Sequence, residues 1–397
     1  MLIIAWKNVW HKPLHSILSL LLFALGVAMI SFLLLVKKQI QDNFEKNLAD
    51  IDLVIGAKGS PLQMILCSMY HVDNPTGNIP LSEVQAFMNP NHPLIKMAVP
   101  LSIGDNYQGF RIIGTTSDFL QLYQVGLQQG KIFANQMEVC IGSEVSKSST
   151  LKIGDEFQSS HGLINEVSEN SHEEHFKVCG ILNKSGTVLD HLIITPLESI
   201  WTVHEPHHVM VSESEKSITS LLVKYRNRSN FQVLNLPRNI NENTNLQAAV
   251  PAIEMNRLYV LLGTAEKALR ILAFAIIIVS GISVFLSLLN ALKERKYELS
   301  LMRVLGASGF RLFGLILSEA AILSIIGSIA GLLLSHTTMA FLDGFVRNQY
   351  NYSFSGFAFV REELLLVFSA ILIGICSGLI PAFMAYRTRL STSLGQN

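Results

Sequence analysis

Four long apolar runs divide this chain of 397 residues. They occupy residues 14–36, 267–292, 312–338 and 364–386, and a helix needs roughly 20 apolar residues to cross a bilayer. Between the first two runs lie residues 37–266, which are mostly polar and numerous enough to form a folded domain with its own core. The pattern therefore predicts one membrane span, a large soluble domain, and three further spans.

Two of these runs are flanked by amphipathic extensions. Val36, Ile40, Phe44 and Leu48 follow the first run at intervals of four residues, and a similar apolar stripe occupies residues 253–269, leading into the second run. This spacing is typical of helices. We expect both helices to continue beyond the bilayer, either as a stalk that transmits motion or as rigid spacers.

The long polar segment has the pattern of an α+β domain. Short runs rich in β-branched and aromatic residues alternate with turn-forming residues, which is typical of strands. The predicted strands are residues 52–57, 96–103, 110–115, 138–141, 176–181, 192–195 and 218–225.

Lys and Arg near the span ends predict the orientation, because cytoplasmic segments carry an excess of both. Such residues are frequent in 1–13, 293–311 and 387–397, and sparse in 339–363. The predicted fold is therefore an α-helical membrane protein with four transmembrane helices and an α+β extracytoplasmic domain, residues 37–266, inserted between helices 1 and 2. Both termini and the 293–311 loop are expected in the cytoplasm, and the 339–363 loop outside it.

The first 13 residues predict an interfacial helix. Its apolar residues fall on one helical face, and Trp is frequent at membrane boundaries; a plain flanking segment is the alternative. The run at 14–36 is too long for the apolar region of a signal peptide, so we interpret it as a span. The expected face consists of Leu2, Ile3, Trp6, Val9 and Trp10.

Composition and motifs exclude several functional classes. Lys plus Arg equals Asp plus Glu, at 30 each, which gives no indication of nucleic-acid binding. The sequence has neither a G-x-x-x-x-G-K-[ST] phosphate-binding loop nor a G-x-S-x-G nucleophile motif. No enzymatic activity and no cofactor are expected of this chain, and any ATP that drives it is expected on another subunit.

The 293–311 loop has the pattern of a short amphipathic helix. Tyr297, Leu301 and Leu305 fall on one face, and Gly306 provides a helix stop. Such a helix can lie at the bilayer surface or dock into a groove on a soluble partner, whereas a charged loop would only fix topology. The other faces carry Glu294, Arg295, Glu298 and Arg303.

This loop resembles the first cytoplasmic loop of the MacB/FtsX-type ABC transporter permeases. Further likeness lies in residues 111–119 with the Gly130-Lys131-Ile132-Phe133 turn, which is similar to the MacB-like periplasmic core domain, although Lys131 stands where Arg is usual. The residues that carry the resemblance in the loop and at the chain's end are Glu294-Arg295, Glu298, Met302-Arg303, Leu305-Gly306-Ala307, Pro381-Ala382 and Tyr386-Arg387.

The resemblance implies a permease subunit in the bacterial inner membrane. It implies a separate ABC ATPase subunit that binds ATP and Mg, and a homodimer or a heterodimer with a related permease. A periplasmic adaptor or substrate-binding protein is a further expected partner. The residues that the resemblance places at the ATPase contact are Glu294, Tyr297, Glu298, Leu301, Arg303, Leu305 and Gly306.

The same resemblance implies that ATPase motion passes through the stalk to the periplasmic domain and moves or releases an extracytoplasmic substrate, by export or by extraction of a lipoprotein. A non-transporting, FtsX-like scaffold that activates a cell-wall hydrolase remains an alternative. A metal-handling receptor is another alternative.

Polar and small residues within the spans suggest helix contacts. Glu319 is an intramembrane carboxylate, which either has a functional or packing partner or reaches back to water. Gly327 with Gly331, and Gly374 with Gly378, have the G-x-x-x-G spacing that permits close helix packing, within one chain or across a dimer.

Histidines and cysteines gather in the large domain. Three cysteines, Cys67, Cys140 and Cys179, allow one disulfide and leave one thiol; burial within predicted strands is the alternative for Cys140 and Cys179. Imidazole and carboxylate groups suit zinc, although a polar surface loop would have the same composition. The candidate metal ligands are His172, His175, His204, His207 and His208.

Overall fold

The computed structural model describes the chain in two compact units. One comprises Met1–Ile40 with Leu262–Asn397, and the other comprises Gln41–Leu261. Each is described by itself. The described residues are 2–11, 13–161, 171–204, 216–350 and 355–387.

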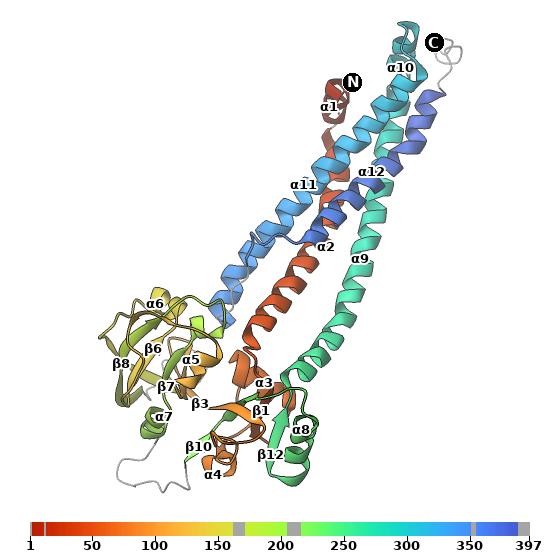
Figure 1. Ribbon diagram of the computed structural model, residues 1–397. Coiled ribbons are helices and arrows are strands. Elements are labelled where there is room, and N and C mark those ends of the chain that lie inside the picture. Colours follow the sequence, from red (N-terminus) through yellow and green to blue (C-terminus); the bar gives the residue numbers. More distant parts are fainter. Residues whose placement is uncertain (1, 12, 162–170, 205–215, 351–354, 388–397) are drawn as a thin grey trace. The chain divides into compact units, whose positions relative to one another are not determined.

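The first unit is helical. Four of its helices, α2, α9, α11 and α12, are long and apolar enough to cross a membrane (Figure 1). Helix α2 continues to Asn47 and α9 begins at Pro251, as the apolar spacing predicted. Helix α11 extends to Tyr350, so much of the expected 339–363 loop is helical. The helices are α1 Leu2–His11, α2 Pro13–Asn47, α9 Pro251–Glu294, α10 Lys296–Val304, α11 Gly309–Tyr350 and α12 Arg361–Tyr386.

Small residues allow close approach of three of these helices. A methyl group added to Gly327 of α11 would lie 2.8 Å from Cδ1 of Phe23, and one added to Gly331 would lie 2.7 Å from the carbonyl oxygen of Ala24, both on α2. Gly374 and Gly378 of α12 face Ser324 and Ala320 of α11 in the same way. Both glycine pairs therefore lie at contacts between helices of one chain.

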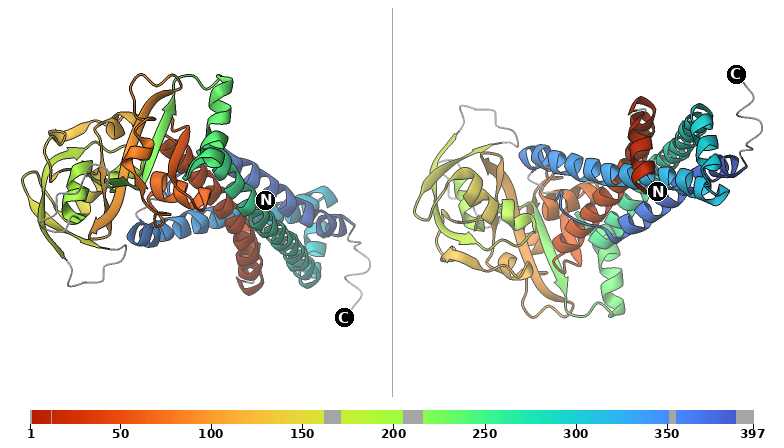
Figure 2. Two further views of the ribbon diagram at one scale, coloured as in Figure 1. Left: turned by 90° about the horizontal axis from the view of Figure 1, so that it is seen from below. Right: turned by 90° about the horizontal axis from the view of Figure 1, so that it is seen from above.

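Helix α1 packs against α11, and Figure 2 shows the two helices from two further directions. Ala5 and Val9 are buried in this contact, whereas Leu2, Ile3, Trp6 and Trp10 are exposed. Val9, at the edge of the expected apolar face, is therefore covered by a neighbouring helix. Val9 shares the buried side with Ala5, four residues earlier, because residues four apart lie on the same side of a helix.

The second unit is a mixed sheet with helices, which agrees with the α+β prediction. Ten strands form the main sheet, and its order is β12-β1-β11-β3-β4-β9-β6-β8-β5, with β7 paired to β3 and β8. Strands β10 and β2 form a separate pair. Most neighbours are antiparallel, but β4 pairs parallel with β9, and β6 pairs parallel with β8.

The seven predicted strands all occur, with shifted ends at several. The predicted strand 218–225 covers the end of β10 and all of β11. Four strands were missed, namely β2, β5, β7 and β12, which are short or rich in polar residues. The strands are β1 Leu53–Ala57, β2 Ile79–Pro80, β3 Ile95–Tyr107, β4 Phe110–Thr115, β5 Leu127–Gly130, β6 Glu138–Ile141, β7 Glu156–His161, β8 Ser171–Leu182, β9 Ile193–Pro196, β10 Ser217–Ile218, β11 Ser220–Tyr225 and β12 Leu246–Ala249. The helices are α3 Pro61–Tyr70, α4 Leu81–Val84, α5 Asp118–Leu122, α6 Ser143–Ser149, α7 Leu197–His204 and α8 Phe231–Asn243, with a 3-10 turn, η1, at Val188–His191.

The ends of α2 and α9 that belong to this second unit touch each other. The ring of Phe44 on α2 meets the ring of Tyr259 on α9 edge to face, with centroids 5.6 Å apart, and stacks on Tyr70 of α3 at 5.4 Å. Aromatic pairs in such geometries stabilise a contact beyond their buried area. The two helical extensions are therefore joined through Phe44.

Candidate functional site around helix α10

Helix α10 ends in a Schellman motif, which fixes its length. The amide of Gly306 donates to the carbonyl of Arg303 at 3.1 Å, and the amide of Ala307 donates to the carbonyl of Met302 at 2.9 Å. Gly306 has φ of +95°, a conformation that glycine adopts without a Cβ clash. The predicted helix stop at Gly306 is confirmed.

One side of α10 is packed against the membrane unit. Leu299 and Ser300 are buried. Leu299 belongs to a cluster of apolar side chains contributed by four other helices. Burial of such side chains stabilises a position by roughly 1.5–3 kcal/mol each, so α10 is held firmly from this side. The buried members of the cluster are Ala5, Leu292, Leu299, Leu312, Leu315, Ile316, Ala382 and Ala385.

The opposite side of α10 presents apolar residues to the outside. Tyr297 is 63% exposed, Leu301 48% and Leu305 79%, and Val304 beside them is also exposed. Phe310, in the first turn of α11, is exposed as well. We call the surface formed by Tyr297, Leu301, Val304, Leu305 and Phe310 the α10 face. Its three predicted members lie on one side of the helix, as their spacing indicated.

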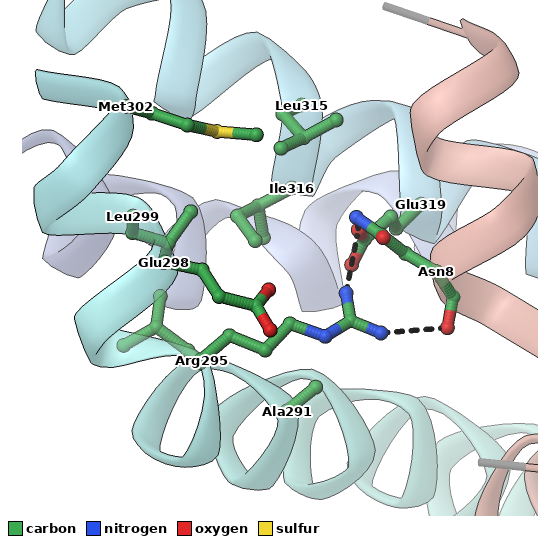
Figure 3. A pocket seen from close by; sticks show the side chains of 10 residues that line it. Asn8, Ala291, Arg295, Glu298, Leu299, Met302, Leu315, Ile316 and Glu319 are labelled. Carbon is green, nitrogen blue, oxygen red and sulfur yellow. Dashed lines mark hydrogen bonds and ion pairs between the residues drawn. The ribbon is translucent and has the colours of Figure 1, made fainter. Parts of the chain in front are cut away.

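Behind α10, Arg295 joins three helices. It occupies the position between α9 and α10, and its Nη1 lies 3.3 Å from Oε1 of Glu319 on α11. Its Nη2 donates to the carbonyl oxygen of Asn8 on α1 at 2.7 Å. The Asn8 amide in turn donates to Oε1 of Glu319 at 2.7 Å. Figure 3 shows this triangle in a pocket that Leu299, Met302 and Ile316 also line.

The triangle gives Glu319 the partner that its position in a span required. The side chain of Glu319 is 3% exposed and that of Arg295 is 14% exposed. A buried charge is costly unless it is paired and hydrogen-bonded, and Arg295 and Asn8 together supply both conditions. The structure therefore shows an interhelical role for Glu319 rather than a side chain reaching to water.

Arg303, which the resemblance placed at the ATPase contact, binds the end of another helix in the same chain. Its Nη2 donates to the carbonyl oxygen of Tyr386, the last residue of α12, at 2.7 Å. A cation near the last carbonyls of a helix complements the helix dipole. Arg303 therefore fastens α10 to the end of α12.

The two glutamates that the resemblance placed at the ATPase contact are both exposed near α10. Glu298 is exposed on the first turn of α10 and lines the pocket (Figure 3). Glu294 is exposed and is the last residue of α9. Asn8 and Tyr386 complete the site and were not expected, because no local pattern marks an asparagine or a carbonyl that pairs with a distant helix.

A second buried carboxylate, Glu363 of α12, was also missed. Its Oε1 lies 2.6 Å from the hydroxyl of Ser31 on α2 and 3.4 Å from Nε2 of His336 on α11. Its Oε2 accepts from the amide of Val360 at 3.1 Å, and Ser335 lies 2.8 Å from Ser31. No local pattern indicates that Glu363 is buried, because it follows Arg361 and Glu362 at the polar start of an apolar run.

The candidate metal ligands are spread over separate elements. His172 and His175 lie on β8, His175 is exposed, and His204 is the last residue of α7. Nε2 of His204 lies 3.5 Å from Oδ1 of buried Asp105. His207 and His208 lie outside the described residues. Within the described ranges, no three His, Cys, Asp or Glu side chains converge as a metal site would require.

Two protein families match the chain. The MacB-like periplasmic core domain matches residues 16–234, which is more than half of the sequence. The FtsX-like permease C-terminal family matches residues 270–390, which include α10, Glu319 and α12. The chain belongs to the MacB/FtsX-type ABC transporter permeases. This confirms the resemblance seen in the 293–311 loop and in the large domain.

Relatives of this MacB/FtsX-type permease include named exporters. The pyoverdine export ATP-binding/permease protein PvdT of Pseudomonas putida is 23% identical over 96% of this chain and 57% of its own length. The protein of the same name from Pseudomonas aeruginosa is 23% identical over 83% of the chain and 50% of its own length. The macrolide export ATP-binding/permease protein MacB of Mannheimia succiniciproducens is 26% identical over 51% of the chain and 28% of its own length.

The permease spans about half the length of the curated relatives that it matches over most of its sequence. A domain of a permease protein from Porphyromonas gingivalis has a solved structure that matches 51% of this chain, with 10% identity and a TM-score of 0.27. That score is too low to bear on the fold.

Proposed function

We propose that this permease transmits the motion of a separate ABC ATPase, through α10 and the membrane helices, to its α+β domain, which moves or releases a substrate outside the cytoplasm. The observation that carries the proposal is the division of α10 into two sides. One side is fixed to the membrane unit by Leu299, Arg295 and Arg303, and the other presents the α10 face.

The α10 face has the properties of a helix that docks into a groove. Tyr297, Leu301 and Leu305 provide anchors at intervals of four residues, which is the spacing used by amphipathic helices in grooves. Glu294 and Glu298 lie beside them and would contribute to the polar rim, where charges affect the association rate more than the affinity. A push on α10 would be passed directly to α1, α11 and α12 through Arg295 and Arg303.

The membrane setting supports the same function. The proposed topology inserts the α+β domain between the first two spans, outside the cytoplasm, with α10 inside, in line with the Lys and Arg distribution. ATP and Mg are assigned to the partner ATPase, and the permease is proposed to work as a homodimer or with a related permease. The continuous helices α2 and α9, joined by Phe44 and Tyr259, support a stalk that carries motion.

The names of the relatives favour export as the outcome of that motion. The relatives are described as export proteins for pyoverdine and for macrolides. We propose the same class of activity here, with a substrate taken from the outer side and a periplasmic adaptor as a further partner. No described feature of the α+β domain favours a cell-wall hydrolase or a resident metal over export.

The decisive experiment compares two leucines on exposed helix surfaces. Leu301→Asp places a charge in the α10 face, while Leu234→Asp makes the same change on α8 of the second unit, where Leu234 is 67% exposed. We expect Leu301→Asp to abolish stimulation of the reconstituted ATPase and co-purification with it, since loss of an interface anchor costs about 2 kcal/mol or more. Leu234→Asp should retain both, and full stimulation by Leu301→Asp would refute the proposed role of α10.

Thiol labelling tests the proposed orientation independently. In a Cys376→Ser background, Ser308→Cys lies in the turn after α10 and Ser229→Cys in an exposed loop of the α+β domain. A membrane-impermeant maleimide applied to intact cells should label Ser229→Cys and spare Ser308→Cys. Labelling in the reverse pattern would invert the topology.

A further inference from the structure

Two buried cysteines of the α+β domain lie side by side. The sulfur atoms of Cys140 on β6 and Cys179 on β8 are 3.9 Å apart. Both side chains are buried, as is Cys67 on α3. Cys67 has a different neighbour, because its sulfur lies 4.0 Å from Nη1 of Arg111. The sequence offered three candidate cysteines for a bridge, and the fold brings these two together.

A β-bulge creates the pairing. Strands β6 and β8 run parallel, and Val139 is opposite Val178, but the next residue, Cys140, is opposite Gly180. Cys179 is therefore the extra residue of the bulge. Neighbouring strands lie about 4.8 Å apart, which falls within the 4.4–6.8 Å between Cα atoms that a disulfide tolerates. Gly180 leaves room beside the pair, because a methyl group there would lie 3.1 Å from the sulfur of Cys140.

The surroundings of the two thiols are unequal. The contact between the two thiols lowers the pKa of Cys179 and raises that of Cys140. Burial and the carboxylate of Glu138 raise the pKa of Cys179, whereas the charge of Lys131 lowers it further. By contrast, burial raises the pKa of Cys67 to about 11. Since the thiolate is the reactive form, Cys179 is the better nucleophile of the pair.

We propose that Cys140 and Cys179 form a dithiol site that closes to a disulfide in the folded chain when a disulfide-bearing oxidant is available. The sulfur atoms need to approach from 3.9 Å to about 2.05 Å. The adjacent strands and the space at Gly180 permit this approach through rotation of the side chains and a small shift of the bulge. In the cell the closure rests on the proposed location of the domain outside the cytoplasm, where disulfides persist.

The chemistry balances with a disulfide as the oxidant. The Cys179 thiolate attacks one sulfur of the oxidant, forms a mixed disulfide and releases one thiolate. The Cys140 thiolate then attacks the sulfur of Cys179 and releases the second thiolate. The two cysteines lose two protons and two electrons in total, and the oxidant is reduced to two thiols.

The closed bridge would tie three parts of the sheet together. It would link β6 to β8 covalently, and β8 already holds the turn after β5, since the amide of Lys131 donates to the carbonyl of Cys179 at 3.0 Å. The Cys140 thiol lies 3.5 Å from the carbonyl of Lys131. Oxidation would therefore stiffen the Gly130–Lys131 turn that the family resemblance singled out.

The test uses the purified full-length chain. After reduction and removal of the reductant, the chain is incubated with oxidised glutathione long enough for local opening of the sheet, then denatured, alkylated with N-ethylmaleimide and analysed by peptide mass spectrometry. We expect one linked pair of peptides, containing Cys140 and Cys179, with both sulfurs protected from alkylation. Cys67 and Cys376 should be alkylated. Free or merely glutathionylated Cys140 and Cys179, or a link to Cys67, would overturn the proposal.

Stability supplies a second measurement on the same samples. We expect the oxidised chain to unfold roughly 5–10 °C above the reduced chain, since a loop-closing disulfide constrains the unfolded state. Cys67→Ser should keep this difference, whereas Cys140→Ser and Cys179→Ser should lose it. Equal unfolding temperatures of oxidised and reduced wild-type chain would contradict a bridge within the folded sheet.

Alkylation in intact cells, before lysis, separates this site from the proposed function. A Cys140–Cys179 link in cell-derived chain supports both the site and the outer location of the domain. Free thiols in the cell, together with a link after incubation with oxidised glutathione, would support the site and refute the location.

Discussion

The hydroxyl of Ser31 lies 2.6 Å from Oε1 of Glu363, a carboxylate with no solvent exposure. This contact joins α2 to α12, and His336 adds α11 to the same site at 3.4 Å. A buried acceptor that serves several donors is costly to remove, because each donor then lacks a partner. Glu363 therefore fixes one end of the membrane unit, as Glu319 fixes the region behind α10.

We predict that Glu363→Leu lowers the free energy of unfolding of the detergent-solubilised permease by about 1–3 kcal/mol, because the Val360 amide loses its acceptor and the Ser31 hydroxyl loses one of its two acceptors. Glu363→Gln should be milder, since its amide oxygen can still accept. Glu362→Leu, on the exposed neighbour, is the matched control and should change little. Thermal unfolding measures all three, and an unaltered Glu363→Leu would show that the contact contributes nothing to stability.

For ATPase stimulation and co-purification, we predict that the hydrogen-bonding capacity of the side chain at position 319 matters more than its charge. Glu319→Gln keeps an oxygen for Asn8, whereas Glu319→Leu leaves both Asn8 and Arg295 without it. ATPase stimulation and co-purification should therefore fall partially with Gln and severely with Leu, because a buried cation without its partner is strongly unfavourable. Ser318→Ala is the control, since the Ser318 hydroxyl donates to the carbonyl of Gly314 within its own helix.

Equal effects of Glu319→Gln and Glu319→Leu on stimulation would argue against the hydrogen-bonded triangle. Wild-type behaviour of both would show that α10 is held sufficiently by its apolar contacts alone.

We predict that replacing Gly306 destabilises the end of α10 through backbone conformation alone and not through a steric clash. Apart from its chain neighbours, no described residue comes within 4 Å of a methyl group built there, yet φ is +95°, and the left-handed region costs a residue with a side chain about 1–2 kcal/mol. Gly306→Ala should therefore weaken ATPase stimulation, and Gly306→Val should weaken it further. Gly314→Ala, equally uncrowded but within α11, should be neutral or stabilising. Similar results for the two alanine variants would contradict this account.

A pH effect is expected at the turn that contains Lys131. The Lys131 ammonium, together with the amides of Ala134 and Asn135, lowers the pKa of Glu138 to about 2. A lowered pKa in the folded state gives a stabilisation that is complete above the unfolded value, about 4.5, and disappears as the pH falls toward 2. Thermal unfolding of wild type and Glu138→Gln should therefore differ at pH 6 and converge near pH 2; a constant difference over this range would exclude the mechanism.

The sequence was most informative where one residue type repeats along one element. Long apolar runs predicted the four spans, the apolar stripe predicted the continuation of α2 through Phe44, and Gly306 predicted the end of α10. Strands β4 and β6 match their predicted bounds, because half of the residues in each are β-branched. Strands such as β5 and β7 consist largely of Gln, Ser and Glu, so neighbouring strands rather than local preference determine them.

The polar contacts between distant helices could not be predicted from residue patterns along the chain. Asn8 and Glu319 are separated by 311 positions, and Ser31 and Glu363 by 332. Their pairing depends on which helices become neighbours, and periodicity within one helix carries no information about that. The burial of Val9 could not be predicted either, since an apolar residue in a membrane-surface helix can face lipid or a neighbouring helix.

The two sides of α10 are subject to different constraints. Leu299, Arg295 and Arg303 support the membrane unit, so most substitutions there would impair folding before they changed any interaction. Tyr297, Leu301 and Leu305 are largely exposed, so their replacement by other apolar residues should cost little stability. If the α10 face is the proposed ATPase contact, partner specificity can be redesigned there while the buried side of the helix stays unchanged.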